Sequence, residues 1–322
     1  MAMRVRVAAG ILAVVIVAAG CAEPEAPRGS GIVDPGPAPS ASPSEEVERP
    51  AAPLSGADST EAIVARRAVA VPVRVGPGSP APAGLAEADI IYQEYAESGS
   101  LRFIAVYQSH DVARIGPVHE IRPSDVKTLT ALGPVVGYGG GPNGFVNQLT
   151  NSKLPAVTQP AGGFTSTATL YKSAPAGSAP PSIFVYAEPG DQVGEGAKPA
   201  TQLTVTVPGR AAQTWQFDQA SQTWRGQVGG TTVAVSSIVV LTMEYKTVDV
   251  RTPAPRNLPT AAVFGTGAAM IVSGGQAVAG KWTKPGAKAV SHVVDSAGFQ
   301  VKLRPGTTWV VYAPNGSSVS TA

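Results

Sequence analysis

The chain has 322 residues, 43% hydrophobic and 14% charged, so it can bury one or two cores and is not disordered throughout. Its single cysteine excludes an internal disulfide and a Cys-rich zinc site, and its three histidines make a metal cluster unexpected. We predict no metal site and no cofactor. The formal net charge of +2 points to no class of partner.

Residues 1–20 have the pattern of a bacterial export signal. Arg4 and Arg6 precede an apolar run over 7–19 that is short for a bilayer span. Small residues then precede Cys21, an order that resembles a lipobox. We therefore expect lipidation of Cys21 and anchoring to the outer face of the cell membrane, for which stable attachment needs two or more acyl chains. An ordinary secretory signal and an uncleaved anchor are the alternatives.

Residues 21–61 are rich in Pro, Ser and Glu and poor in large apolar side chains, which predicts a disordered tether. Because residues 21–61 are acidic and residues 1–20 carry two positive charges, residues 62–322 have an excess of six positive charges. An excess of this size is typical of a solvated basic surface, so no nucleic-acid partner is predicted. The expected partners are the membrane, through Cys21, and an anionic wall polymer or an envelope protein.

The body begins with strand patterns. β-Branched and aromatic residues over 68–75, 89–95 and 101–108 predict three strands, the last two joined as a hairpin by a turn at residues 98–100. Pro123 begins a predicted helix that ends near Gly133, a strand follows over 134–139, and residues 144–151 suit a second helix.

The C-terminal part has no helical pattern beyond about residue 199. Short strand-like runs recur between Gly, Pro and Asn at residues 203–207, 231–235, 238–244, 287–294 and 307–312. The predicted fold is therefore α+β. It has mixed β-sheets with a few helices over residues 62–198 and a β-rich part over residues 199–322.

A glycine-rich segment runs from Gly139 through Gly141 to Gly144, after a predicted strand and before a possible helix. This G-x-G-x-x-G spacing suits a phosphate cradle of backbone N–H groups. No acidic residue follows at the distance that a dinucleotide ribose requires, and Pro142 removes one donor. A small-anion nest and a plain glycine turn therefore remain ahead of a dinucleotide site.

Carboxylates and histidines gather in the N-terminal part. Glu94, Glu97, Glu120 and Asp125 lie near His110 and His119 in the sequence, which permits acid–base chemistry but more often indicates salt bridges. The four tryptophans, at 215, 224, 282 and 309, fall in the β-rich part. They suit a core there better than a sugar-stacking platform.

Several motifs together resemble the YerB-like lipoproteins, a bacterial envelope family whose activity is not established. In the first half these motifs are Ala88–Tyr92, Glu97, Gly99, Arg102–Phe103, Ala105–Val106, Arg114–Val118 and Arg122; in the second half they are Trp215–Arg225, Gly265–Gly267, Gly280–Trp282 and Leu303–Val310. The resemblance covers residues 67–314. It implies a signal-anchored, extracytoplasmic fold in two parts.

The chain departs from the family pattern at three places. Gln93 stands where relatives usually carry an acid, His119–Arg122 replaces Arg-Ser-Ala-Arg, and Thr167–Thr169 replaces Pro-His-Asn. A catalytic role of that His and Asn in relatives would be lost in this chain, which lowers the expectation of an enzyme.

The charged residues that remain are Asp89, Glu97, Arg102, Arg114 and Arg122. Such a set can clamp an anionic ligand or lock a hairpin to a helix. We expect Arg102, in a strand, to be architectural, and Arg114 and Arg122 to be accessible. The predicted ligand-binding residues are Arg114, Arg122, Glu97, Asp89, Gly139 and Gly141.

We therefore expect a membrane-anchored lipoprotein that acts as a binding or scaffolding component of the bacterial cell envelope. An envelope hydrolase acting on cell-wall material is the alternative. Convergence of the acidic and basic groups in an open cleft would favour ligand binding or catalysis, whereas burial as closed ion pairs would favour an architectural role.

Overall fold

The computed structural model describes residues 49–174, 176–251 and 255–322. The predictions for the export signal and for Cys21 lie outside these residues. The helices are α1 (Glu61–Ala65), α2 (Pro123–Leu129), α3 (Asn143–Asn151) and α4 (Thr167–Lys172). No helix among the described residues is long and apolar enough to cross a membrane.

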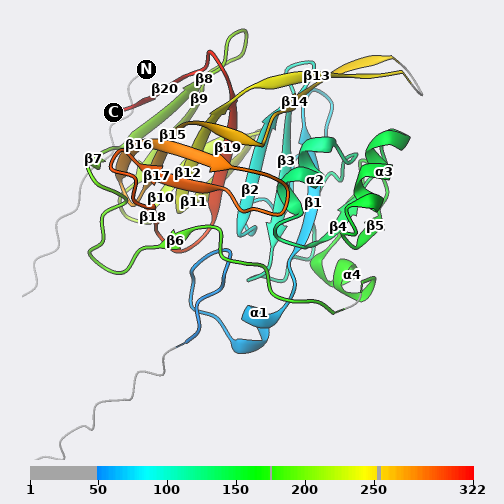
Figure 1. Cartoon of the computed structure of the whole chain (residues 1–322), viewed down its shortest axis with the longest axis horizontal. Helices are drawn as coiled ribbons and strands as arrows, with labels where there is room; N and C mark the ends of the chain where they lie inside the picture. Colours follow the sequence, from blue (N-terminus) through cyan, green and yellow to red (C-terminus); the bar gives the residue numbers. More distant parts are fainter. Residues whose placement is uncertain (1–48, 175, 252–254) are drawn as a thin grey trace, which may run out of the picture. The chain divides into compact units, whose positions relative to one another are not determined.

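Strands dominate the structure (Figure 1). An 11-stranded sheet contains, in order, β17 (His292–Asp295), β16 (Gln276–Lys284), β15 (Gly265–Ser273), β12 (Ser237–Met243), β19 (Thr308–Pro314), β2 (Ile90–Tyr95), β3 (Leu101–Tyr107), β1 (Val69–Val75), β4 (Val135–Tyr138) and β5 (Ala156–Thr158), and β7 (Lys198–Pro199) pairs with β16. A 5-stranded sheet contains β11 (Thr231–Val235), β10 (Thr223–Val228), β9 (Gln213–Asp218), β8 (Gln202–Thr206) and β20 (Ser318–Thr321). Two further pairs are β13 (Tyr245–Val250) with β14 (Arg256–Ala261), and β18 (Lys302–Leu303) with β6 (Val185–Tyr186).

The large sheet joins the two sequence halves. Strand β19, from the C-terminal half, lies parallel between β12 and β2, and its Trp309 is opposite Ile91 of β2. The rest of the sheet mixes parallel and antiparallel pairs, including the predicted β2–β3 hairpin. The α+β class with mixed sheets and a β-rich C-terminal part is confirmed. The two sequence halves share one hydrogen-bonded sheet.

Alternating side chains of the large sheet build two cores, one on each face. Ile90 and Tyr92 pack on one face with the apolar side of α2 and α3, whereas Ile91 and Phe103 pack on the other with Trp215 and Trp224 of the 5-stranded sheet. Because side chains alternate between the two faces of a strand, a strand covered on both faces is buried along its whole length. All six residues of β2 are buried for this reason.

Helix α2 begins at Pro123 as its sequence predicts and ends at Leu129, before the predicted end near Gly133. Pro123 occupies the first turn, where its missing N–H costs nothing, and Gly133 closes the segment with φ +61° and an N–H that donates to the Leu129 carbonyl over 3.1 Å. Helix α3 is also present, beginning at Asn143. Helices α1 and α4 are not predicted. Each is capped by a hydroxyl, Thr60 for α1 and Ser166 for α4.

The predicted tether boundary at residue 61 needs correction, because residues 50–61 are packed against the body. Ala51 pairs with Asp58 across a β-bridge, and Leu54 is fully buried in the core. Ser55 accepts a hydrogen bond from the Gly306 N–H over 2.7 Å. Burial of Leu54 together with these backbone contacts holds a segment whose composition otherwise suits a disordered chain.

The β13–β14 ribbon reaches from the C-terminal half across the N-terminal half (Figure 1). Strand β14 contacts β2 and α2, and Leu258 is fully buried in the core. Tyr245, at the start of the ribbon, donates to the Tyr312 carbonyl over 2.7 Å and accepts from the Tyr95 N–H over 3.1 Å. The ribbon therefore covers the sheet beside the charged residues predicted from the sequence.

Candidate functional site

The predicted charged residues separate into a buried ion-pair network, an isolated buried aspartate and an exposed arginine. Arg102 and Arg122 lie in the network with Glu97, Asp89 is buried at the start of β2, and Arg114 lies at the surface. The cluster expected from the sequence is therefore not one site.

The inner part of the network is Arg102, Asp125 and Glu94. Arg102, on β3, is fully buried and donates from both Nη atoms to Asp125 on α2; its Nη1 lies 2.5 Å from Oδ1. The same Nη1 is 3.5 Å from the Glu94 carboxylate. Glu94 also accepts from the Ser124 hydroxyl over 3.0 Å and from the Ala261 N–H over 2.6 Å. This arrangement locks the β2–β3 hairpin to α2 and β14.

The outer part of the network surrounds Arg122. The Arg122 guanidinium is buried, donates to Glu97 over 2.9 Å and lies 3.4 Å from Glu120. Glu97 also pairs with Arg74 over 3.2 Å, and Glu120 with Arg256 over 2.7 Å. The expectation that Arg122 is accessible is therefore wrong. Arg122 is covered by the turn that carries Glu97 and by strand β14, which carries Arg256. Both segments are distant from residue 122 in the sequence.

Burial and charge act differently on the two glutamates. Burial raises the pKa of Glu94 above its ordinary value, and Arg102 opposes that shift only in part. Burial also acts to raise the pKa of Glu97, but Arg122 and Arg74 outweigh it, so that pKa lies below the usual range. Glu97 is thus held as a carboxylate by two arginines, which gives it an architectural role.

Asp89, Gly139 and Gly141 also differ from their predicted role. The buried Asp89 carboxylate accepts from the Gln108 N–H over 2.5 Å and the Ser109 N–H over 2.9 Å, which fastens the end of β3. Gly139 donates to the His119 carbonyl over 2.8 Å, and a Cβ on Gly141 would lie 3.2 Å from the Ile121 carbonyl. The glycine segment packs on residues 119–121 as a close-packed turn.

His119 lies beside the network with its imidazole mostly buried. Burial lowers its pKa to about 3, with further lowering by Arg102, Arg74 and Arg122, and Glu97 opposes the shift. An unfolded histidine titrates near 6.5. Between these two values the unfolded chain binds a proton that the folded chain does not, so His119 destabilises the fold as the pH falls from 6.5 toward 3.

We expect the variant His119→Gln to reduce this acid sensitivity. Between pH 7 and pH 4 the wild type should lose roughly 1–3 kcal/mol more of its unfolding free energy than the variant. Urea denaturation at both pH values measures the difference. His292→Gln, which removes an exposed imidazole, is the matched control and should follow the wild-type curve. Equal acid losses in wild type and His119→Gln would contradict the assignment.

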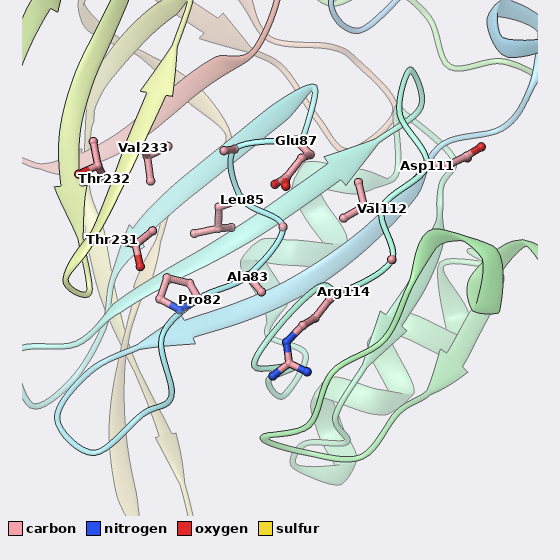
Figure 2. Close-up of a pocket in the computed structure, with 13 residues that line it drawn as sticks. Pro82, Ala83, Leu85, Glu87, Asp111, Val112, Arg114, Thr231, Thr232 and Val233 are labelled. Carbon is pink, nitrogen blue, oxygen red and sulfur yellow. The ribbon is translucent and has the colours of Figure 1, made fainter.

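Arg114 borders a surface pocket with a volume of about 470 Å³ (Figure 2). The pocket is lined by residues 82–87, 111–114 and 231–233. In Figure 2 the β11 residues Thr231 to Val233 lie on one side of it and Arg114 on the other, with Glu87 and Asp111 toward one end. Its volume is within the range of small-ligand sites.

The segment that carries Arg114 is held firmly by the segment before α4. Ile115 and Thr165 exchange two backbone hydrogen bonds of 2.8 and 2.9 Å, and the Thr167 hydroxyl accepts from the Val112 N–H over 2.9 Å. The Arg114 guanidinium stacks on the Phe164 ring with its carbon 3.4 Å from the ring centre. No carboxylate of the described residues lies within ion-pair distance of Arg114.

Sequence reasoning missed one wall of this pocket and the aromatic ring that stacks on Arg114. Residues 231–233 are recognisable as a strand but not as part of a site, and Phe164 stands in a segment without a strand or helix pattern. Only the fold brings them close to Arg114. All four tryptophans are buried, so the sugar-stacking alternative is not supported. The described residues contain no group of three or more His, Cys, Asp and Glu that is placed to hold a metal ion.

Comparison with known proteins gives matches in both halves. Residues 54–198 match "Protein of unknown function (DUF3048) N-terminal domain", and residues 203–310 match the corresponding C-terminal domain. "Putative lipoprotein YerB" of Bacillus subtilis (strain 168) is 33% identical over 98 residues, which is 30% of this chain and 30% of the relative. The match thus spans less than a third of that protein. The crystal structure of the YerB protein from Bacillus subtilis has a TM-score of 0.67 and 19% identity, covering 84% of this chain and 100% of that chain, which shows a common fold.

Proposed function

The chain belongs to the YerB-like family of proteins of unknown function, and on that premise we propose that it is an envelope lipoprotein with a binding role. Its ligand carries an anionic group that Arg114 recognises in the pocket beside β11. The observation that carries this proposal is the Arg114 guanidinium itself. It is exposed, stacked on Phe164 at 3.4 Å, and without an ion-pair partner among the described residues.

An exposed guanidinium that is stacked on a ring and has no ion-pair partner is pre-organised to bind an anion. Stacking on an aromatic ring restricts the side chain before a ligand arrives, so less conformational entropy is lost on binding. Its planar fork matches a carboxylate or a phosphate with two parallel hydrogen bonds. The scaffold supplies rigidity, because the β-bridge between Ile115 and Thr165 fixes both the arginine and its aromatic neighbour.

The buried network supports a binding role over the hydrolase alternative. Its carboxylates are engaged by Arg102, Arg122 and Arg74 inside the fold, an arrangement that suits a structural clamp. The network and the pocket thus have separate roles, one structural and one in binding. The network holds β3, α2 and β14 together, and the loops around Arg114 offer a surface for a partner.

The variant Arg114→Gln tests the proposal with two small probes, acetyl-Ala-Ala with a free carboxylate and glycerol 3-phosphate. We expect at least one of them to shift amide NMR signals of residues 83–87 and 111–114 in the wild type. Because the variant loses a charge-assisted hydrogen bond, its affinity for that probe should be about 10- to 100-fold lower. Arg225→Gln, which alters another exposed arginine, should bind as the wild type does. Unchanged affinity in Arg114→Gln would overturn the proposal.

The proposed anchoring of this function depends on Cys21. Replacing Cys21 with alanine removes the thiol that would receive the lipid, so the protein should leave the detergent-extracted membrane fraction for the soluble or uncleaved pool. Fractionation followed by intact-mass measurement checks this result. An unchanged mass together with unchanged membrane partitioning would refute lipidation at this residue.

A further inference from the structure

We propose that the free edge of β11 receives an extended peptide, which pairs with it as an additional strand inside the Arg114 pocket. This inference rests on the proposed function and deepens it by naming the class of ligand. It combines two observations: an unpaired strand edge that borders the pocket, and the charges that line the pocket.

The pairing of β11 shows which of its backbone groups are free. Strand β11 lies at the end of its sheet, and among the described residues it pairs only with β10. The turn between them is Gly229–Gly230, with φ values of +57° and +79°, which is the type I′ geometry of a two-residue hairpin. In such a hairpin the residues flanking the turn, here Val228 and Thr231, exchange backbone hydrogen bonds, and bonded and non-bonded pairs then alternate. The N–H and C=O groups of Thr232 and Ala234 therefore point away from β10.

These outward groups have no backbone partner in the described part of the chain. The edge also lacks the usual protection against strand addition, because Thr-Thr-Val-Ala-Val contains no Lys, no Pro and no bulge. The edge of β17 differs, since Val293 and Asp295 hold the returning segment at Val301 and Phe299. An unprotected edge beside a pocket is the feature that β-strand addition uses.

The other walls of the pocket fit a peptide laid along β11. Leu85 and Val112 are buried apolar residues among those that line it, and Thr231 to Val233 form one side (Figure 2). A peptide strand would lie about 4.8 Å from β11 and offer alternating N–H and C=O groups to Thr232 and Ala234. Sugars and lipid chains lack this repeat of donors and acceptors.

Charge favours a peptide over a polyanion. Arg114 offers one positive group for a carboxylate, whereas Glu87 and Asp111 line the same pocket and would repel a chain of phosphates or carboxylates. Asp111 keeps its own partner, Arg66, at 2.8 Å. The fitting occupant is therefore an extended segment of an envelope protein with a single carboxylate, either a C-terminus or an acidic side chain.

The experiment uses the full-length protein in detergent and the labelled peptide fluorescein-Thr-Val-Thr-Val-Ala with a free carboxylate. We expect saturable binding by fluorescence anisotropy, and slower hydrogen exchange at the amides of Thr232 and Ala234 when the peptide is bound. The same peptide with alternate backbone nitrogens methylated cannot complete the ladder, and its binding should be at least tenfold weaker. Equal binding of the methylated peptide would overturn the proposal.

Two matched variants locate the contact on the protein. Thr232→Pro removes the outward N–H at a position where an edge strand accepts proline, and Thr232→Val removes the same hydroxyl but keeps the N–H. We expect the proline variant to bind at least tenfold more weakly and the valine variant to bind within threefold of the wild type. If Thr232→Pro does not fold, the methylated peptide on the wild type still decides the question.

The outcomes for the two proposals are separable. Loss of binding in Arg114→Gln with no effect of methylation or of Thr232→Pro would keep the anion site and overturn strand addition. Sensitivity to methylation with full binding in Arg114→Gln would keep strand addition and overturn the anion site. Absence of any binding up to 1 mM peptide would overturn strand addition, whatever the small probes show.

Discussion

The variant Arg102→Ala is expected to lower the free energy of unfolding by about 3–5 kcal/mol. Arg102 is fully buried and pairs with Asp125 and Glu94, so its removal leaves two buried acidic groups without their cation. Most of this loss in stability comes from leaving the buried carboxylates without a cation, and less comes from the loss of the ion-pair contacts themselves. Chemical denaturation followed by circular dichroism measures it.

Arg122→Ala should cost less, roughly 1–3 kcal/mol, because Glu97 and Glu120 lose the buried Arg122 but keep Arg74 and Arg256 as partners. Arg114→Ala is the matched control and should change stability by no more than about 0.5 kcal/mol, since Arg114 is exposed. Losses above about 1 kcal/mol in both buried variants, with a smaller change at Arg114, would establish the division between clamp and pocket. A loss below about 1 kcal/mol for Arg102→Ala would show that the clamp is not structural.

The variant Trp309→Ala should also lose about 3–5 kcal/mol, through the cavity that it leaves in the centre of the large sheet. Trp309 is fully buried, with its ring centre 5.0 Å from that of Trp215 and 5.3 Å from that of Phe103. Its indole N–H donates to Gln93 over 2.9 Å. Because Phe103 and Trp215 come from different sequence halves, both halves should unfold together in one transition at the lower denaturant concentration.

Phe299→Ala is the control for Trp309→Ala, because Phe299 is 66% exposed and its loss leaves no buried cavity. Tryptophan fluorescence and far-ultraviolet circular dichroism should give the same midpoint for each protein. Two separate transitions in Trp309→Ala would contradict the view that β19 joins the halves into one cooperative unit.

The sequence predicts those strands well whose pattern is local. Runs of β-branched and aromatic residues predict the strands β1, β2, β3 and β19. The proline in the first turn predicts the start of α2. Sheet order is not local. Trp309 lies opposite Ile91 across more than two hundred residues of chain, and nothing in either strand's composition specifies that register.

The site was harder to predict for the same reason. Arg114 and Arg122 bracket the predicted Gly116–Pro117 turn after β3, and residues beside a loop turn are expected to be exposed. Only Arg114 is exposed, because Glu97 and the ribbon residue Arg256 close the region around Arg122. Burial of a charged side chain depends on what the rest of the chain places above it, and a single sequence does not record that.

The central position of β19 sets the order in which this protein can fold. Strand β2 pairs on one edge with β3 of the same hairpin. Its other edge pairs with β19, residues 308–314, near the C-terminus. During synthesis the N-terminal strands therefore emerge long before the strand that completes them. Contacts of such high sequence separation slow folding, since a long loop must close first. The large sheet therefore closes only after synthesis has reached residues 308–314, and the chain stays incompletely folded until then.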